Sequence, residues 1–351
     1  MSIGIDIGKF SIKIVELSSK GDQIEVKNIG VLPVFSNINK FNLEKITRAQ
    51  LEATLQDLTG TMGINAKKAK NIVTSLSGSL VDIREITTLD MDDNELSVSL
   101  ELEAKKHIPL DGTDAIIDFH HLGANKKEID KINVILTSTT KNIITEHATL
   151  IKNAGYKPNI FDADPVALSN LYKYNFDLPD EGCDVILNIG NSSSNIIAWG
   201  KNSPFFTRTI ESGGDFFNNE VMKTFNADYQ TAEKMKIEKG INVFDDDKEE
   251  ELVDNNIGIS IEKKTAFNTF ADDIRTTLKY YMRNNSQTFL NNFYITGGSS
   301  SLLGMDDFIA KNINVKVQQL DPFKNISNSI EVENLNQFSI AIGLALRGLE
   351  N

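Results

Sequence analysis

The feature of this 351-residue sequence that most constrains its fold is a strand–turn–strand pattern that occurs twice. The first copy covers residues 3–17 and the second covers residues 184–199. At a constant offset of 182 residues, three pairs of positions correspond: Asp6 with Asn188, Gly8 with Gly190, and Ser11 with Ser193. Two copies of one hairpin at this distance predict two structurally related halves.

The amino-acid composition excludes several classes of protein. The chain carries a net charge of −13, from 36 Lys and Arg against 49 Asp and Glu. This charge argues against nucleic-acid binding and against broad docking on anionic lipid, since both need an excess of basic residues. With 40% hydrophobic residues a sizeable core can form, and the length predicts two or three domain-sized units. The single cysteine, Cys183, excludes an internal disulfide framework and a Cys-rich metal site.

The sequence has no membrane-directing pattern. Its first residues lack the basic and apolar regions of a signal peptide. The most apolar stretch, residues 338–349, is shorter than the roughly 20 residues of a membrane span and contains Arg347. We therefore expect a cytoplasmic protein that reaches a membrane only through a partner.

Around the repeat, the hydrophobic pattern predicts an α/β protein. The first half is expected to contain antiparallel strands, a helix ended by glycines and a buried strand: 3–7, 12–17 and 24–33, then 43–58 ended by Gly60 and Gly63, then 71–76. A self-contained block follows, with the order strand, helix, strand, strand, helix: 81–89, a helix opened by Asp92 and stopped by Pro109, 115–122, 132–138 and 141–153. This order is typical of a small inserted subdomain.

The second half is expected to add further elements after its hairpin. They are a strand at 205–210, a helix with Phe216, Phe217, Val221 and Phe225 on its apolar side, a solvated charge run at 245–251, a long helix through Ile274, Leu278 and Tyr281, a strand at 293–296, and an apolar helix at 339–349. The histidines do not form a metal-site pattern, because His120 and His121 point to opposite faces of a strand and His107 and His147 stand alone on helices.

Three Gly/Ser-rich turns, at residues 6–11, 188–193 and 297–300, each follow a predicted strand. Taken alone, each is an ordinary turn. Two such hairpin turns facing each other would hold a phosphate chain between their backbone N–H groups. The residues expected to bind phosphate are Gly8, Lys9, Phe10, Ser11, Gly190, Asn191, Ser192 and Ser193, with Lys13 adding a positive charge. Asp6 is expected to hold Mg²⁺ through water.

The third turn offers a flat glycine surface for adenine or ribose, with a helix N-terminus behind it. The residues expected to bind adenosine are Gly213, Gly214, Gly297, Gly298 and Ser299. The chain has no G-x-x-x-x-G-K-[ST] segment and no G-x-G-x-x-G after a strand. It is therefore not a P-loop protein, and a Rossmann fold is disfavoured.

These three turns occur in the order of the phosphate-1, phosphate-2 and adenosine motifs of the ATPase superfamily that includes actin, heat-shock chaperones and sugar kinases, which the chain resembles. Within it, the chain is similar over nearly its whole length to the PilM family of type IV pilus assembly proteins, relatives of the division protein FtsA. The segments that carry this resemblance are residues 4–17, 101–109, 154–165, 296–298 and 341–349.

The resemblance implies an actin-like ATPase fold of four subdomains around a cleft that binds ATP or ADP with Mg²⁺. The implied limits are 1–80 with 161–180 and 338–351 (subdomain 1A), 81–160 (the inserted subdomain 1C), 181–228 with 284–337 (2A), and 229–283 (2B). It also gives Glu233 and Lys236 adenosine-binding roles, although an ordinary surface helix with alternating charges explains these two residues equally well.

One departure from the superfamily pattern bears on activity. Asn188 stands where an aspartate is usual, and an amide supplies neither charge nor base, so it is at most a weak magnesium ligand. We expect ATP to be hydrolysed slowly or not at all.

By resemblance, the chain would be a nucleotide-binding scaffold of the pilus inner-membrane platform. It would bind the cytoplasmic tail of the membrane protein PilN, near the inserted and first subdomains, and other platform proteins. Two alternatives stay open: an actin-fold small-molecule kinase, and an FtsA-like protein that self-associates into filaments.

Overall fold

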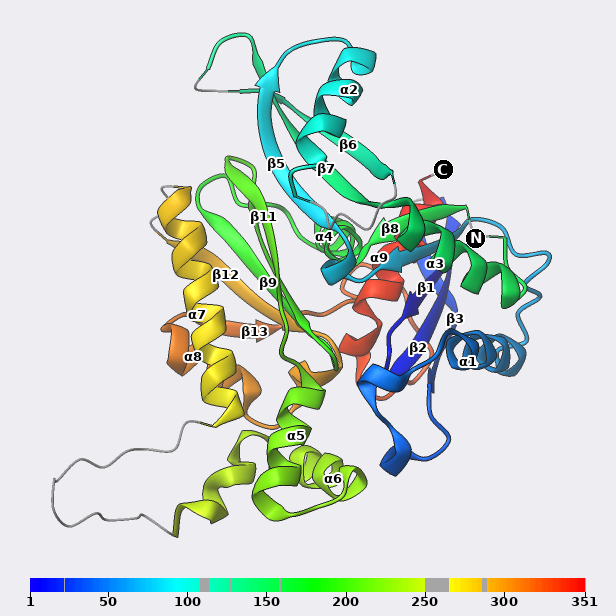
Figure 1. The fold of residues 1–351 in the computed structure, drawn as a ribbon, viewed down its shortest axis with the longest axis vertical. Helices are drawn as coiled ribbons and strands as arrows, with labels where there is room; N and C mark the ends of the chain where they lie inside the picture. The colour runs from blue at the N-terminus through cyan, green and yellow to red at the C-terminus, as the bar shows by residue number, and fades with distance from the viewer. Residues whose placement is uncertain are drawn as a thin grey trace, which may run out of the picture.

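A computed structural model describes residues 1–21, 23–107, 114–125, 128–157, 159–249, 265–285 and 289–350, with backbone alone for 246–249. Three β-sheets with flanking helices form the molecule (Figure 1). Two of the sheets have five strands each, and the third has three strands.

The first sheet has the strand order β3-β2-β1-β4-β8. Its strands are β1 (Ser2–Ile7), β2 (Ser11–Lys20), β3 (Gln23–Pro33), β4 (Ile72–Leu76) and β8 (Ile160–Ala163). The first three are antiparallel as predicted, and β4 and β8 continue the sheet in parallel with β1. Helices α1 (Arg48–Thr61) and α3 (Lys141–Asn153) cover one face, and α4 (Asp164–Asn175) and α9 (Ser339–Leu349) cover the other.

The second sheet repeats this topology in the order β11-β10-β9-β12-β13. Its strands are β9 (Cys183–Ile189), β10 (Ser194–Gly200), β11 (Ser203–Ile210), β12 (Leu290–Thr296) and β13 (Val317–Gln319). The hairpins also share their register, since Ile7 pairs with Ile12 in one and Ile189 with Ser194 in the other. The predicted internal repeat is therefore confirmed. Helices α5 (Gly214–Phe225), α7 (Ala266–Asn284) and α8 (Met305–Ile313) pack on this sheet, and α6 (Tyr229–Lys239) packs on α5.

The third sheet comprises β5 (Asp82–Leu89), β7 (Lys131–Thr140) and β6 (Ala115–Ala124), in that order. Helix α2 (Asp93–Ala104) begins at its cap Asp92, as predicted, and covers one face of the sheet through Leu96 and Leu100. It ends well before Pro109, which lies outside the described residues. Helix α3 shares a core with α1 on the first sheet. The residue limits of the four subdomains stay a prediction.

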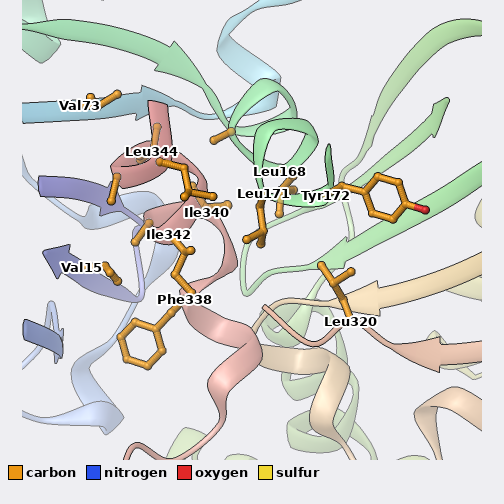
Figure 2. Packing of buried hydrophobic residues seen from close by; sticks show 14 of the residues in the cluster. Val15, Val73, Leu168, Leu171, Tyr172, Leu320, Phe338, Ile340, Ile342 and Leu344 are labelled. Carbon is orange, nitrogen blue, oxygen red and sulfur yellow. The ribbon is translucent and has the colours of Figure 1, made fainter. Parts of the chain in front are cut away.

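A continuous hydrophobic core joins the two halves, with α4 and α9 at its centre (Figure 2). It draws Val15 and Val73 from the first sheet, and Ile186 and Ile197 from the second. The fit around α9 depends on glycines. A Cβ on Gly4 would lie 2.0 Å from the carbonyl oxygen of Ala341, and one on Gly343 would lie 1.9 Å from that of Ala167. Helix α9 therefore packs backbone against backbone with β1 and α4.

Three sequence-based expectations need correction. The first predicted helix begins at Arg48, because a Thr47–Gln50 capping box starts α1 there, and residues Leu43–Lys45 form a separate 3-10 turn. Gly60 lies inside α1, which ends at Thr61. Residues Gly298–Ser301 form a short 3-10 turn, so no α-helix N-terminus stands directly behind the third glycine turn. Part of the predicted charge run, from residue 250 onward, lies outside the described residues.

Candidate functional site

The turn after β9 is bonded to two other glycine-containing segments. The Gly190 N–H donates to the Ser193 carbonyl (3.1 Å) and closes the turn. The Gly190 carbonyl in turn accepts from the N–H of Gly214 (3.0 Å) and from Ser299 Oγ (3.2 Å). The structure thus brings together the second turn, the start of α5 and the third turn, which were predicted from residues far apart in sequence.

Close approach explains most of the glycines in this cluster. A Cβ on Gly213 would lie 2.6 Å from the Gly190 carbonyl oxygen. Gly297 has φ +91°, and its Cβ would lie 2.4 Å from Asn188 Oδ1. Gly298 differs, because the nearest atom to its Cβ position is 3.9 Å away, on Gln337. Gly298 therefore has free space in front of it, as a surface for a ligand requires.

Helix α6 supplies a buried charge to this cluster. The Lys236 side chain is 3% exposed, forms an ion pair with Glu233 (2.7 Å) and donates to the Gly214 carbonyl (3.3 Å). Glu233 also accepts a hydrogen bond from the amide of Asn218. Burial lowers the pKa of Lys236, and the charge of Glu233 opposes this shift. The surface-helix alternative is therefore wrong for Lys236, while the adenosine-binding roles stay predictions.

The first turn carries an ion pair. Lys13 Nζ lies 3.3 Å from Asp6 Oδ2 and donates to the Ser11 carbonyl (3.3 Å). A Cβ on Gly8 would lie 3.3 Å from the same amine. Lys13 thus lies across the turn, where its charge is available to an anion held by the turn amides. In the second hairpin, the residues paired at the corresponding positions are Asn188 and Asn195, so that hairpin carries no charge there.

Phe10 and Lys9 differ from the other predicted phosphate-binding residues. The Phe10 ring packs against Phe35 (4.9 Å between centroids) and Phe41 (5.3 Å), so only its backbone is available to a phosphate. Lys9 is exposed. Phe41 also contacts Tyr229 on α6 (5.2 Å between centroids), so this aromatic cluster links the first half to the second.

Asp164 is a site residue that the sequence analysis missed. It opens α4, and Ser75 Oγ donates to it (2.5 Å). Burial is the main cause that raises the pKa of Asp164 to about 7; the neighbouring Asp6 contributes to the rise, and Ser75 and Lys13 oppose it. Its only sequence signal was an acidic residue at a strand-to-helix junction, just before Pro165. Two carboxylates and one amine therefore meet in the first half.

The residues present fit a nucleotide phosphate chain. Asn191 Nδ2 is buried and has no hydrogen-bond partner, so a donor is available next to Gly214. The turn amides and Lys13 supply further donors, and Asp6 and Asp164 supply the carboxylate oxygens that Mg²⁺ prefers. In the described part of the chain, no group of three or more His, Cys, Asp or Glu residues could hold a metal ion by itself. A magnesium ion would therefore depend on the nucleotide for further ligands.

The two groups of site residues are linked at one side. Asn39 accepts from the Gln230 N–H (2.8 Å) and donates to Asp228 (3.0 Å) at the start of α6. Between the first and second turns themselves, no hydrogen bond is found among the described residues. Two cavities of about 220 and 230 Å³ lie elsewhere, one beside Tyr172 and Lys324 and the other between Asp82 and Arg208.

His147 is half-buried between α3 and β4. Its Nε2 lies 3.0 Å from Thr74 Oγ1, and burial lowers its pKa to about 4. His147 is therefore neutral at pH 7 and serves the packing between α3 and β4.

Comparison with known proteins identifies the fold and the family. The model of the family "Type IV pilus assembly protein PilM" matches residues 4–349. Among solved structures, a "PilM-PilN type IV pilus biogenesis complex" matches with TM-score 0.81 and 22% identity, over 100% of this chain and 99% of the other. The ethanolamine utilization protein EutJ from Carboxydothermus hydrogenoformans matches with TM-score 0.55 and 12% identity, over 98% and 89%.

These matches, together with the two sheets of identical topology, show the actin-like ATPase fold that the sequence resemblance implied. The family match covers nearly every residue, from the first strand to the last helix. The chain belongs to the family of type IV pilus assembly protein PilM.

Proposed function

We propose that this chain is a nucleotide-binding scaffold of the type IV pilus assembly platform, at the cytoplasmic side of the inner membrane. The family match over residues 4–349 carries this proposal, and the likeness to a PilM–PilN complex supports it. The partner is the cytoplasmic N-terminal tail of PilN, with contacts to other platform proteins and self-association as further roles. No helix in the described ranges is long and apolar enough to cross a membrane.

The proposed ligand is ATP or ADP with Mg²⁺. The first and second turns would hold the phosphates through backbone N–H groups, and Lys13 and Asn191 would add side-chain donors. The adenosine would lie against Gly214, Gly298 and the buried pair Glu233–Lys236. The observations that support this assignment are the hydrogen bonds from Gly214 and Ser299 to Gly190, the partnerless amide of Asn191 and the free space at Gly298. The four subdomain limits implied by resemblance belong to the same proposal.

We propose that hydrolysis is slow or absent. The two carboxylates proposed to face the phosphates, Asp6 and Asp164, belong to the first half, and the second hairpin presents the neutral Asn188. A small-molecule kinase would need a free base near the γ-phosphate. Asp6 is paired with Lys13, which leaves Asp164 as the candidate for that role. A phosphate-release assay should give little or no turnover above buffer, and steady turnover well above buffer that Asp164→Asn abolishes would favour an enzyme instead.

The decisive experiment has two arms. Protein purified without added nucleotide is denatured, and the released small molecules are identified by chromatography; ATP or ADP is expected. A synthetic peptide of the N-terminal tail of PilN from the same genome is then titrated by calorimetry, with and without Mg²⁺ and ATP. If the protein neither retains nor binds nucleotide, the proposed nucleotide binding is wrong. If the peptide does not bind, the proposed interaction with PilN is wrong.

A further inference from the structure

Asp162, on the edge strand β8, has a buried carboxylate oxygen without a partner. Its Oδ1 accepts the N–H of Ala163 (2.8 Å), while its Oδ2 is buried and accepts no hydrogen bond. Buried polar atoms in native proteins nearly always have a partner, because leaving one unpaired costs free energy. Asp162 Oδ2 therefore marks a place where a donor from outside the chain would be stabilising.

Charged side chains from two other elements act on this carboxylate: Arg347 and Glu350 at the end of α9, and Asp118 on β6. Burial is the main cause that raises the pKa of Asp162 to about 6, with smaller contributions from Asp118 and Glu350, and the Ala163 N–H and Arg347 oppose the rise. Arg347 also pairs with Glu350 (3.3 Å). We call the place defined by Asp118, Asp162, Arg347 and Glu350 the β8–β6 junction; its carboxylates outnumber its single guanidinium.

The surroundings of the junction suit an extended peptide. Strand β8 is at the end of its sheet and pairs with β4 (Figure 1). On β6, alternation places Ile116, Asp118 and His120 on one face, while Ile117 and Phe119 pack toward α2 on the other. Ile116 is 41% exposed on the face that carries Asp118. The inserted sheet thus presents an apolar side chain and an acidic one together.

We propose that Asp162 anchors a positively charged donor from the tail of the partner: its terminal ammonium, or a Lys or Arg side chain. This inference rests on the proposed function, because the tail is that of PilN. A cationic donor satisfies Oδ2 and offsets the surplus of carboxylates at the junction, which a neutral amide would not do. Ile116 packs against an apolar residue of the same segment. Asp162 is therefore a specificity-determining residue for the partner.

The inference is tested with the PilN-tail peptide at low salt and pH 7.5, by fluorescence anisotropy. Asp162→Asn keeps the shape of the side chain and removes its charge, and it is expected to weaken binding by about tenfold or more. Asp307→Asn, which removes an exposed carboxylate from α8, is the matched control and should leave affinity unchanged. A thermal melt checks folding, and Asp162→Asn should be at least as stable as the natural chain, because it removes a buried charge.

Peptide variants distinguish the source of the donor. In one variant the terminus is acetylated, and in the others a single Lys or Arg is replaced by Gln. The variant that removes the donor to Asp162 should weaken binding to the natural chain and have no further effect on binding to Asp162→Asn. Lowering the pH from 7.5 to 5 should also weaken binding, since Asp162, whose pKa is about 6, becomes protonated.

The experiment distinguishes failure of the proposed function from failure of the inference about Asp162. No binding of the unmodified peptide to the natural chain rejects the proposed function itself. Binding that is equal for the natural chain and Asp162→Asn rejects this inference and leaves the proposed function standing. Equal binding of all peptide variants to the natural chain also rejects the inference.

Discussion

At the scale of single residues, two adjacent glycines in the third turn have opposite surroundings. Gly297 has a positive φ, and a side chain there would collide with Asn188 and Ile189. Gly298 has no atom nearer than 3.9 Å to its Cβ position. Gly297 therefore serves the packing of the turn, while Gly298 leaves room for the proposed adenosine.

Gly298→Asp should abolish nucleotide binding, because its carboxylate would occupy that room. Since the substituted side chain meets little protein, the fold should survive, and calorimetry with ATP and Mg²⁺ is the measurement. Gly298→Asn is the matched control, because its side chain has nearly the same volume as that of aspartate but carries no charge. ATP affinity equal to that of the natural chain in the aspartate variant would contradict the assignment of the third turn.

Asp164 makes stability depend on pH. Its folded pKa of about 7 lies above the ordinary aspartate value of 3.8, so the folded state binds the extra proton between these pH values. Stability contributed by the protonated form is present at low pH and is lost as the pH rises toward 7. Asp164→Asn should therefore stabilise the nucleotide-free protein at pH 8, by on the order of 2 kcal/mol, and much less at pH 4. Denaturant unfolding at the two pH values measures this, and an equal effect at both would refute it.

At the scale of elements, a half-buried carboxylate is one of the links between the inserted sheet and the second half. Glu85 on β5 accepts the N–H of Phe205 on β11 (2.7 Å) and the amide of Asn133 (3.1 Å). Burial raises the pKa of Glu85, and the hydrogen bond from Phe205 opposes this. The edges of two sheets that are separate in sequence therefore meet through a side chain, with no strand pairing between β5 and β11.

Glu85→Ala should loosen this contact, because it leaves the buried Phe205 N–H without an acceptor. We expect a loss of about 1–3 kcal/mol in unfolding free energy. Hydrogen exchange should be faster at β11 and unchanged at β3, the other hairpin edge. Glu85→Gln keeps an acceptor and should retain most of the protection. Equal exchange in all three proteins would show that the contact does not hold the insert.

At the scale of the whole molecule, the halves share one core but differ in charge at the site. Tyr172 on α4 donates a hydrogen bond to the buried Asp184 on β9, across the boundary between the halves. The Phe41–Tyr229 contact also joins them, beside the site. A nucleotide bound by both halves would add a further connection.

Mg²⁺ and ATP should therefore raise the unfolding temperature of the natural chain. At a ligand concentration of 100 times Kd, the expected stabilisation is about 2.7 kcal/mol. Gly298→Asp should show no shift under the same conditions, which separates specific binding from an effect of salt. Calorimetric scanning with and without ligand provides the measurement.

The repeat, the two equivalent hairpins and the apolar last helix could all be predicted from the sequence alone. These features follow from local patterns: alternation in strands, turn glycines and helical spacing, which need no knowledge of distant residues. The family resemblance and the glycine turns were also visible there, because their residues are contiguous.

Which polar residues are buried or brought close together depends on the tertiary structure. The burial of Lys236, the approach of Asp164 to Asp6 and the partnerless oxygen of Asp162 all depend on segments that are far apart in the chain. Burial and charge–charge effects act through space, over a few ångströms, and a linear pattern carries no such distances. Asp162 and Asp164 are two positions apart in the sequence, yet the structure places Asp164 near Asp6 and Asp162 near Asp118 of the third sheet.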